Sequence, residues 1–192
     1  LRATRTVDVR AAMTESRVAS RAVATPPARA LDLGAGGGLP GLVLASRIWP
    51  GTSWTFLDAQ QKRTEFLREV VTDLGLDDRV AVITERAEVL GRSPDHRGVY
   101  DLVVSRSFGP PAVTAECGAP LLRPGGRLVV SEPPGGSAGR WPDAGLAEAG
   151  LQADGPLHID DVHLMVLVRT ADPIDRLPRR SGIPAKRPLF TL

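Results

Sequence analysis

The residues with the clearest chemical meaning form a glycine-rich turn that runs from Asp32 to Gly41. Its sequence is Asp-Leu-Gly-Ala-Gly-Gly-Gly-Leu-Pro-Gly, and an apolar run of strand length leads into it. When a strand leads into clustered glycines and then into a helix, free backbone N–H groups lie beside a ligand with no side chains in the way. The turn therefore predicts a pocket for a nucleotide-like cofactor.

The glycines alone do not identify the cofactor, because Gly36, Gly38 and Gly41 also have the G-x-G-x-x-G spacing of dinucleotide sites. Asp32 lies two residues before Gly34, still on the predicted strand. A carboxylate there suits the positively charged amino-acid half of S-adenosylmethionine and would repel a pyrophosphate. Asp32 thus favours S-adenosylmethionine over a dinucleotide, and glycines that serve only a tight turn are the least favoured alternative.

Two further carboxylates follow the next two predicted strands. Asp58 ends the second apolar run, where an acceptor-only side chain takes both ribose hydroxyls, although a dinucleotide enzyme would carry this residue too. Glu88 follows the third run, at a position where methyltransferases commonly meet the adenine. We therefore expect Asp58 at the ribose and Glu88 at the adenine of one cofactor.

Arg106 is the candidate catalytic side chain. It follows the fourth apolar run, at the carboxyl end of a predicted strand, where a guanidinium can hold a substrate phosphate, a guanine edge or the cofactor carboxylate. The alternative is a structural ion pair with a neighbour such as Glu132. Cys117 lies among small residues and is expected to serve packing, and one cysteine with three scattered histidines predicts no metal site.

Short apolar runs alternate with amphipathic stretches along the middle of the chain. This alternation predicts an α/β fold with a doubly wound, mostly parallel sheet, whose ligand lies outside the carboxyl ends of the strands. A strong apolar run at 162–168 predicts an antiparallel terminal strand. The predicted strands are 30–33, 54–57, 80–83, 102–105 and 127–130. One predicted helix begins at residue 40 or 41, and three others cover 62–74, 112–122 and 143–149.

The segment 62–74 has the clearest helical pattern, with apolar residues on one face and charged residues on the other. The residues expected to pack on the sheet are Phe66, Leu67, Val70, Val71 and Leu74.

Charge divides the 192 residues into three parts. Residues 1–29 carry six arginines against two acids and are predicted to be a basic arm, 30–170 to be the cofactor-binding domain, and 171–192, with five cations against two acids, to be a basic tail. Clustered cations predict an anionic partner such as nucleic acid, with solvated coil as the alternative. Because no apolar run nears the roughly 20 residues that span a bilayer, a soluble, cytoplasmic protein is expected. We also expect it to be a monomer.

Several stretches resemble one family closely. The chain is similar in them to the 16S ribosomal RNA guanine-N7 methyltransferases, the RsmG or GidB family. The Leu-Pro-Gly at 39–41 and the Ser-Arg at 105–106 are the most specific of these marks. Besides the turn at 31–41, the stretches are Leu57-Asp58, Lys62-Arg63-x-x-Phe66-Leu67, Arg86-Ala87-Glu88, Asp-Leu-Val-Val-Ser-Arg-Ser-Phe at 101–108 and Leu-Pro-Arg-Arg-Ser-Gly-Ile-Pro-Ala-Lys-Arg-Pro-Leu at 177–189.

The resemblance implies a class I methyltransferase fold, which is Rossmann-like, with S-adenosylmethionine as cofactor, S-adenosylhomocysteine as product and ribosomal RNA as partner. It implies that Gly34 and Leu39 line the cofactor, that Ala87 and Glu88 meet its adenine end, and that Arg106 lies at the methyl-transfer end. Together with the residues argued from the turn, the predicted cofactor site comprises Asp32, Gly34, Gly36, Gly38, Leu39, Asp58, Ala87, Glu88 and Arg106.

Methylation of guanine N7 needs no general base, because N7 is an unprotonated acceptor at neutral pH. The enzyme mainly has to align the nucleophile, the methyl group and the leaving sulfur. The fourth strand ends without the Asn/Asp-Pro-Pro-aromatic sequence used on exocyclic amines, which argues against amine methylation.

Two alternatives stay open. The family has Lys-Gly after the fifth strand where this chain has Ser131-Glu132, and an acid there would oppose an RNA phosphate. A methyltransferase with another substrate is therefore one alternative, and a cofactor-binding protein without activity is the other.

Overall fold

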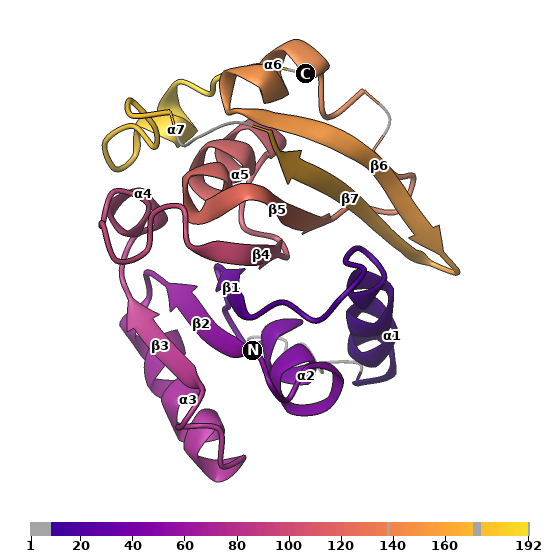
Figure 1. The fold of residues 1–192 in the computed structure, drawn as a ribbon, viewed down its shortest axis with the longest axis vertical. Coiled ribbons are helices and arrows are strands. Elements are labelled where there is room, and N and C mark those ends of the chain that lie inside the picture. Colours follow the sequence, from indigo (N-terminus) through magenta and orange to yellow (C-terminus); the bar gives the residue numbers. More distant parts are fainter. Residues whose placement is uncertain (1–8, 138, 171–173, 192) are drawn as a thin grey trace, which may run out of the picture.

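The structure is a computed structural model that describes residues 9–137, 139–170 and 174–191. Its centre is a sheet of seven strands in the order β3-β2-β1-β4-β5-β7-β6 (Figure 1). The strands are β1 Arg29–Leu33, β2 Ser53–Asp58, β3 Val80–Thr84, β4 Tyr100–Ser105, β5 Leu122–Ser131, β6 Leu151–Ile159 and β7 Val162–Arg169.

The first five strands are parallel, and β7 pairs antiparallel with both β5 and β6. The chain leaves β3 at one edge and returns at β4 beside β1, so the strand order reverses between β1 and β4. A crevice forms at such a switch point, outside the carboxyl ends of the strands. The predicted doubly wound, mostly parallel sheet with an antiparallel terminal strand is confirmed.

Helices cover both faces of the sheet. One hydrophobic cluster includes residues of α4, α5 and α6, and the other includes residues of α1, α3 and the turn after α2. Successive residues of β1 serve both, since Leu31 and Leu33 belong to the first cluster and Ala30 to the second. The helices are α1 Val9–Ser20, α2 Gly41–Val43 with a wider turn at Leu44–Ile48, α3 Gln61–Asp73, α4 Ala87–Leu90, α5 Pro111–Gly118, α6 Asp143–Glu148 and α7 Ile183–Lys186.

Helix α1 lies in the segment that the sequence predicted to be a basic arm. Its residues Val18 and Ala19 are buried against the second cluster, and the helix lies beside α2 and the turn end of the β6–β7 hairpin (Figure 1). Residues 9–20 of the predicted basic arm therefore form a helix that packs on the domain. Two or three apolar contacts suffice to dock a short helix, and so few leave only a weak periodic signal in the sequence.

The predicted helix at 62–74 is confirmed as α3, but its apolar face is only partly covered. Leu67 and Val71 are buried, whereas Phe66 and Leu74 are 49% and 51% exposed. The helix packs on β2 and β3, and β3 is the edge strand, so no further strand lies under its outer side. The expectation that Phe66 and Leu74 pack on the sheet is wrong for this reason.

Strand β6 was not predicted. Exposed and partly buried residues alternate from Leu151, which is buried, to Ile159. In the sequence, however, Gly155 and Pro156 interrupt the apolar pattern of a strand. An edge strand tolerates proline because one side of it has no ladder to complete, and β6 is the other edge of this sheet.

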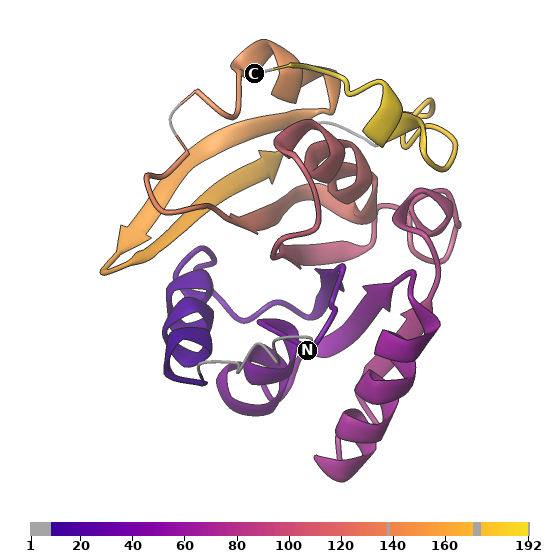
Figure 2. The same cartoon turned by 180° about the vertical axis from the view of Figure 1, so that it is seen from behind.

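The C-terminal segment 174–191 is irregular apart from α7, as expected, but it is not a solvated coil. Leu177 is 1% exposed, and α7 lies beside α4 and α5 in both views (Figures 1 and 2). Within the described residues, no helix has the length and apolar character that crossing a membrane requires.

Candidate functional site

Two clefts meet at the carboxyl ends of the central strands. The first, here called the turn cleft, has a volume of about 350 Å³ and is lined by Gly34, Asp58 and Glu88 among others. The second, the Arg106 cleft, has a volume of about 560 Å³. Ser107, Phe108 and Gly109 line both clefts, so the segment that follows β4 forms their shared wall.

The glycine turn is held against the neighbouring strand. The backbone N–H groups of Gly34 and Ala35 both donate to the carbonyl of Leu57 at 2.9 Å. Gly34 has a φ of +74°, and a Cβ atom there would lie 2.7 Å from Cδ2 of Phe108. Only glycine combines this backbone with so close an approach, and Phe108 therefore packs directly over the start of the turn.

Asp58 connects β2 to this turn. Its Oδ2 accepts a hydrogen bond from the N–H of Gly36 at 3.0 Å and its Oδ1 from the N–H of Gln60 at 2.8 Å, and Arg63 approaches Oδ2 at 3.3 Å. The carboxylate is nearly buried yet lines the turn cleft. Asp58 therefore lies at the carboxyl end of the second strand, and its oxygens accept from the backbone of the turn and of the residue before α3.

Asp32 lies beneath the turn and lines neither cleft. Its Oδ2 accepts from the N–H of Gly41 at 2.9 Å, while its Oδ1 is buried with no hydrogen-bond partner within the described residues. Complete burial raises the pKa of Asp32 to about 7. The nearby charges of Glu15 and Asp58 also raise this pKa, whereas the hydrogen bond from the Gly41 N–H lowers it. A Cβ atom at Gly41 would lie 2.5 Å from Oδ2, so this glycine admits the carboxylate.

Ala87 and Glu88 line the far end of the turn cleft. Glu88 Oε1 accepts from Arg86 Nη2 at 3.0 Å and from the N–H of Gly182 at 2.8 Å. Burial opposes ionisation, but these donors together hold the pKa of Glu88 below its usual value. The carboxylate predicted to meet the adenine is thus bound to the C-terminal segment, whose Ala185 also lines this cleft.

Arg106 lines the second cleft and is 42% exposed. Its Nη1 lies 3.1 Å from Oε2 of Glu15 on α1, and the other oxygen of Glu15 is hydrogen-bonded to the hydroxyl of Ser131. Ser107 follows with a φ of +54°, a left-handed conformation that is costly for serine and aims Phe108 between the two clefts.

Glu132 is not the partner of Arg106 that the sequence suggested. Its side chain is 1% exposed, its Oε1 accepts from Trp141 Nε1 at 3.0 Å, and its Oε2 lies 2.7 Å from Nε of Arg140. The distance between Oε2 and Nε is that of an ion pair, but the geometry is not that of a hydrogen bond, because neither atom has a hydrogen-bond partner within the described residues. Burial raises the pKa of Glu132, so the carboxylate is internal rather than a surface charge at the entrance.

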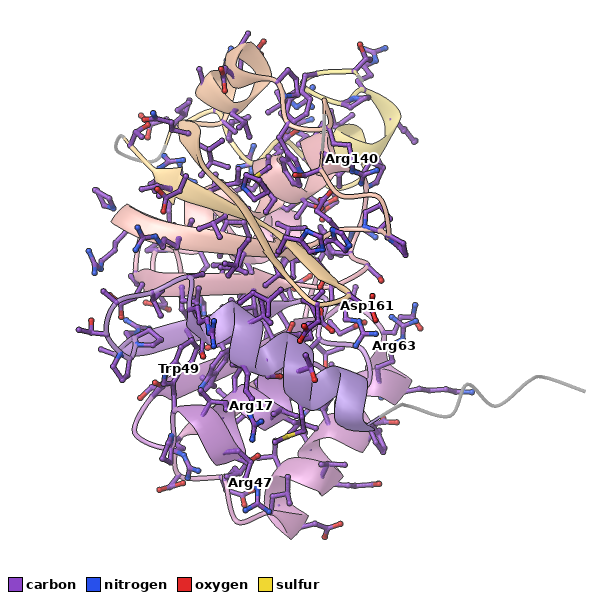
Figure 3. The ribbon with its side chains drawn as sticks, turned by 90° about the vertical axis from the view of Figure 1, so that its right-hand side faces the viewer. Arg17, Arg47, Trp49, Arg63, Arg140 and Asp161 are labelled. Atoms are coloured by element: carbon purple, nitrogen blue, oxygen red, sulfur yellow. The ribbon has the colours of Figure 1, made fainter. Side chains whose placement is uncertain are left out.

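Both clefts open on one side of the molecule. In Figure 3, Arg140 and Asp161 of the Arg106 cleft and Arg63 of the turn cleft lie along the same side. Phe108 lies on the wall that the two clefts share.

The structure brings together part of the predicted site. Gly34, Asp58, Ala87 and Glu88 line the turn cleft, and Arg106 lines its neighbour. Asp32, Gly36, Gly38 and Leu39 line neither cleft. The prediction did not include Glu15, Trp141 or Ala185, which reach the clefts from distant parts of the chain and carry no local signal of their place.

The remaining candidates serve packing or lie apart. Cys117 is 1% exposed, and burial raises the pKa of its thiol far above the usual range, so it is no nucleophile. His158 and His163 stack on each other across β6 and β7 with ring centroids 3.8 Å apart. No group of three or more potential metal ligands was found among the residues that the structure describes.

Sequence comparison identifies close relatives. The family described as rRNA small subunit methyltransferase G matches residues 9–132. Proteins named ribosomal RNA small subunit methyltransferase G are 39% identical in Roseiflexus castenholzii, over 85% of this chain and 72% of the relative, and 39% identical in Deinococcus radiodurans, over 84% and 66%. The relative of the same name in Chloroflexus aggregans is 34% identical over 96% of this chain and 79% of its own length.

Solved structures share the fold at low sequence identity. A SAM-dependent methyltransferase from Aquifex aeolicus superposes with a TM-score of 0.65 at 16% identity, covering 84% of this chain and 93% of that one. TrmN from Thermus thermophilus gives 0.60 at 21% identity over 81% and 48%. These likenesses show the methyltransferase fold alone.

Proposed function

The chain belongs to the rRNA small subunit methyltransferase G family, and from this membership we propose that it transfers a methyl group from S-adenosylmethionine to N7 of a guanine in 16S ribosomal RNA. The observation that carries the proposal is the meeting of two clefts at Phe108, one beside the glycine turn and one beside Arg106. A two-substrate transfer requires this geometry, because donor and acceptor must touch at one point.

The turn cleft fits the cofactor. Asp58 supplies carboxylate oxygens at the end of β2 for the ribose hydroxyls, and Gly34 keeps the backbone free of a side chain where the cofactor approaches. Asp32 adds a buried oxygen without a partner under the turn, which favours a positively charged ligand above it. Ala87 and Glu88 form the end assigned to the adenine, and Gly36, Gly38 and Leu39 keep the turn in place.

The Arg106 cleft receives the guanine. When bound, S-adenosylmethionine supplies an electrophilic methyl carbon, whose bond to sulfur breaks with the electron pair going to sulfur as N7 donates its own lone pair. The chain's task is alignment: Phe108 and Gly109 border the path between donor and acceptor, and Arg106, held by Glu15, faces the acceptor. No side chain has to remove a proton from N7, which carries none.

The buried position of Glu132 weakens the case for a different substrate. An exposed acid after β5 would repel an RNA phosphate, but this carboxylate is internal and paired with Arg140. Arg106 and Arg140 line the cleft, where they are paired with Glu15 and Glu132. The cations that favour an RNA backbone are the exposed Arg180, Lys186 and Arg187 on the C-terminal segment. We propose that the protein acts as a monomer in the cytoplasm, where ribosomal RNA is found.

Nucleoside analysis tests the proposal directly. Protein-free 16S ribosomal RNA is incubated with purified protein and S-adenosylmethionine, digested, and examined for 7-methylguanosine by mass spectrometry. Asp58→Ala is expected to abolish both product formation and S-adenosylhomocysteine binding in titration calorimetry. Asp73→Ala, a change at the exposed end of α3, is the matched control and should behave as wild type.

Each alternative predicts a different result. Binding of NAD without binding of S-adenosylhomocysteine would contradict the cofactor. Binding of S-adenosylhomocysteine with a methyl group transferred to another molecule would contradict the substrate, and binding with no transfer to any cellular RNA or small molecule would favour a protein without activity.

A further inference from the structure

The C-terminal segment is fastened to the body of the protein by a buried ion pair. We call residues 177–186 the C-terminal strap. Glu116 on α5 is completely buried, and both of its oxygens accept from Arg179: Oε1 from Nε at 2.8 Å and from the backbone N–H at 2.9 Å, and Oε2 from Nη2 at 2.6 Å. A forked arginine that satisfies a buried carboxylate in this way fixes one orientation of the backbone that carries it.

The second attachment joins Glu88 on α4 to Gly182, which lies three residues beyond Arg179 on the strap. Oε1 of Glu88 accepts from the N–H of Gly182 at 2.8 Å. Gly182 has a φ of +81° and begins α7, so this bond sets the direction in which α7 leaves. Glu88 also lines the turn cleft, and the strap is therefore attached at the wall of that cleft.

Two arginines hold the beginning of the strap from the other side. Arg97 Nη1 donates to the carbonyl of Leu177 at 2.6 Å, and Arg92 Nε donates to the carbonyl of Pro178 at 2.7 Å. Leu177 is buried beneath them. Charge-assisted bonds to backbone carbonyls restrain the chain itself, whatever its side chains are.

The far end of the strap reaches the turn cleft. Ala185 on α7 lines this cleft together with Glu88 and Val113, although it lies 97 positions beyond Glu88 in the sequence. Its side chain is exposed and its methyl group leaves room beside the cleft wall. We propose that the C-terminal strap is the outer wall of the cofactor site at its adenine end, and that Glu116 and Arg179 are positioning residues that set cofactor affinity.

This inference rests on the proposed cofactor and assigns a role to a segment that its charge alone would give to RNA. Arg179 is one of the tail's cations, but its guanidinium is consumed by Glu116 and by the carbonyl of Arg187 at 2.6 Å. If the strap is a wall of the cofactor site, docking of the strap raises the affinity for the cofactor. Binding of the cofactor must then stabilise the docked strap by the same free energy.

A pair of substitutions tests whether the C-terminal strap forms a wall of the cofactor site. Ala185→Trp fills the cleft from an exposed position, and overpacking of this kind is expected to raise the dissociation constant of S-adenosylhomocysteine at least about tenfold. Ser181→Trp is the matched control, because Ser181 is exposed on the same strap and does not line the cleft. Both variants should keep the thermal unfolding temperature of the wild type.

A second pair tests the positioning role. Arg179→Gln should raise the dissociation constant of S-adenosylhomocysteine and speed hydrogen exchange of the Gly182 amide, whereas Arg180→Gln, at the exposed neighbouring position, should do neither. If Arg179→Gln does not fold, the Ala185 pair still decides the question.

The outcomes separate the two proposals. Wild type that fails to bind S-adenosylhomocysteine contradicts the proposed function. Wild type that binds it, with an unchanged affinity in Ala185→Trp, overturns the strap as a wall, and an unchanged affinity in a folded Arg179→Gln overturns the positioning role.

Discussion

The guanidinium of Arg106 lies 3.1 Å from the carboxylate of Glu15, Nη1 to Oε2, and this contact joins the residue after β4 to helix α1. Glu15 also accepts from Ser131 at the end of β5. One carboxylate thus joins Arg106 after β4, Ser131 at the end of β5 and helix α1.

Replacing Arg106 should slow methyl transfer without affecting the cofactor. Loss of a charge-assisted hydrogen bond costs about 1.5–3 kcal/mol, so kcat/KM of Arg106→Ala on protein-free 16S ribosomal RNA should fall about 10- to 150-fold. The kcat/KM of Arg106→Lys should lie between those of wild type and Arg106→Ala, because lysine keeps the charge but lacks the forked guanidinium. Affinity for S-adenosylhomocysteine is the control, and a loss there instead of in kcat/KM would place Arg106 at the cofactor.

Glu15→Gln should act through Arg106. The amide keeps the size of the side chain and removes the charge that orients the guanidinium, so a decrease of about threefold to tenfold in kcat is expected. If Glu15 works only by holding Arg106, the double variant Glu15→Gln/Arg106→Ala will be no slower than Arg106→Ala alone. Additive losses in this cycle would show that Glu15 acts on its own.

Asp58→Asn should weaken cofactor binding. The substituted amide turns a donor toward the N–H groups of Gly36 and Gln60, which the carboxylate now satisfies. A cost of about 2 kcal/mol would raise the dissociation constant of S-adenosylhomocysteine about 30-fold, measured by calorimetry. Asp73→Asn is the control, and equal affinities in the two variants would remove Asp58 from the site.

Gly34→Ala should damage the turn, whereas Gly37→Ala should be tolerated. At Gly34 the φ of +74° costs an alanine about 1–2 kcal/mol, and its Cβ would displace Phe108 from both clefts. At Gly37 an added Cβ meets no atom within 4 Å. The thermal unfolding temperature and the affinity for S-adenosylhomocysteine should therefore both fall in Gly34→Ala and stay unchanged in Gly37→Ala. Equal behaviour of the two would mean that Phe108 moves freely.

Asp32→Asn should stabilise the protein at high pH. Burial raises the pKa of Asp32 from 3.8 to about 7 in the folded state, so between these values the native protein holds a proton that the unfolded chain has lost. The contribution of Asp32 to the free energy of unfolding therefore falls as the pH rises through this window, by at most about 4 kcal/mol. Above the window this stability is not recovered. Asparagine keeps the acceptor for Gly41 and has no charge to bury.

Urea unfolding at pH 5 and pH 8 measures this effect. The stability difference between Asp32→Asn and wild type should be larger at pH 8 than at pH 5. Parallel pH profiles for the two proteins would show that Asp32 does not titrate in this range.

Much of the framework was predictable because it is written in neighbouring residues. The glycine turn, the strand before it and the helix at 61–73 follow from patterns a few residues long, and so does the position of Asp58 at the end of β2. Helix α1 and strand β6 escaped prediction because few apolar residues mark the first, while glycine and proline interrupt the second.

The pairings within the site were out of reach for a different reason. Glu15 had several arginines to choose from, and Arg106 several acids, and no local rule selects partners that lie 91 positions apart. Likewise, Glu88 was expected at an adenine, but the structure gives its oxygen a backbone N–H from Gly182, 94 residues further on. Opposite charges attract without regard to sequence, so only the folded chain decides which pairs meet.

The sequence by itself determined that the chain carries a glycine turn of the methyltransferase type, with Asp32 and Asp58 around it, because turn geometry and strand ends are local consequences of residue type. Only the tertiary structure decided that Phe108 lies between two clefts, that α1 brings Glu15 to Arg106 and that Ala185 of the basic tail lines the turn cleft. Those contacts depend on the sheet order, which brings distant segments to the same edge.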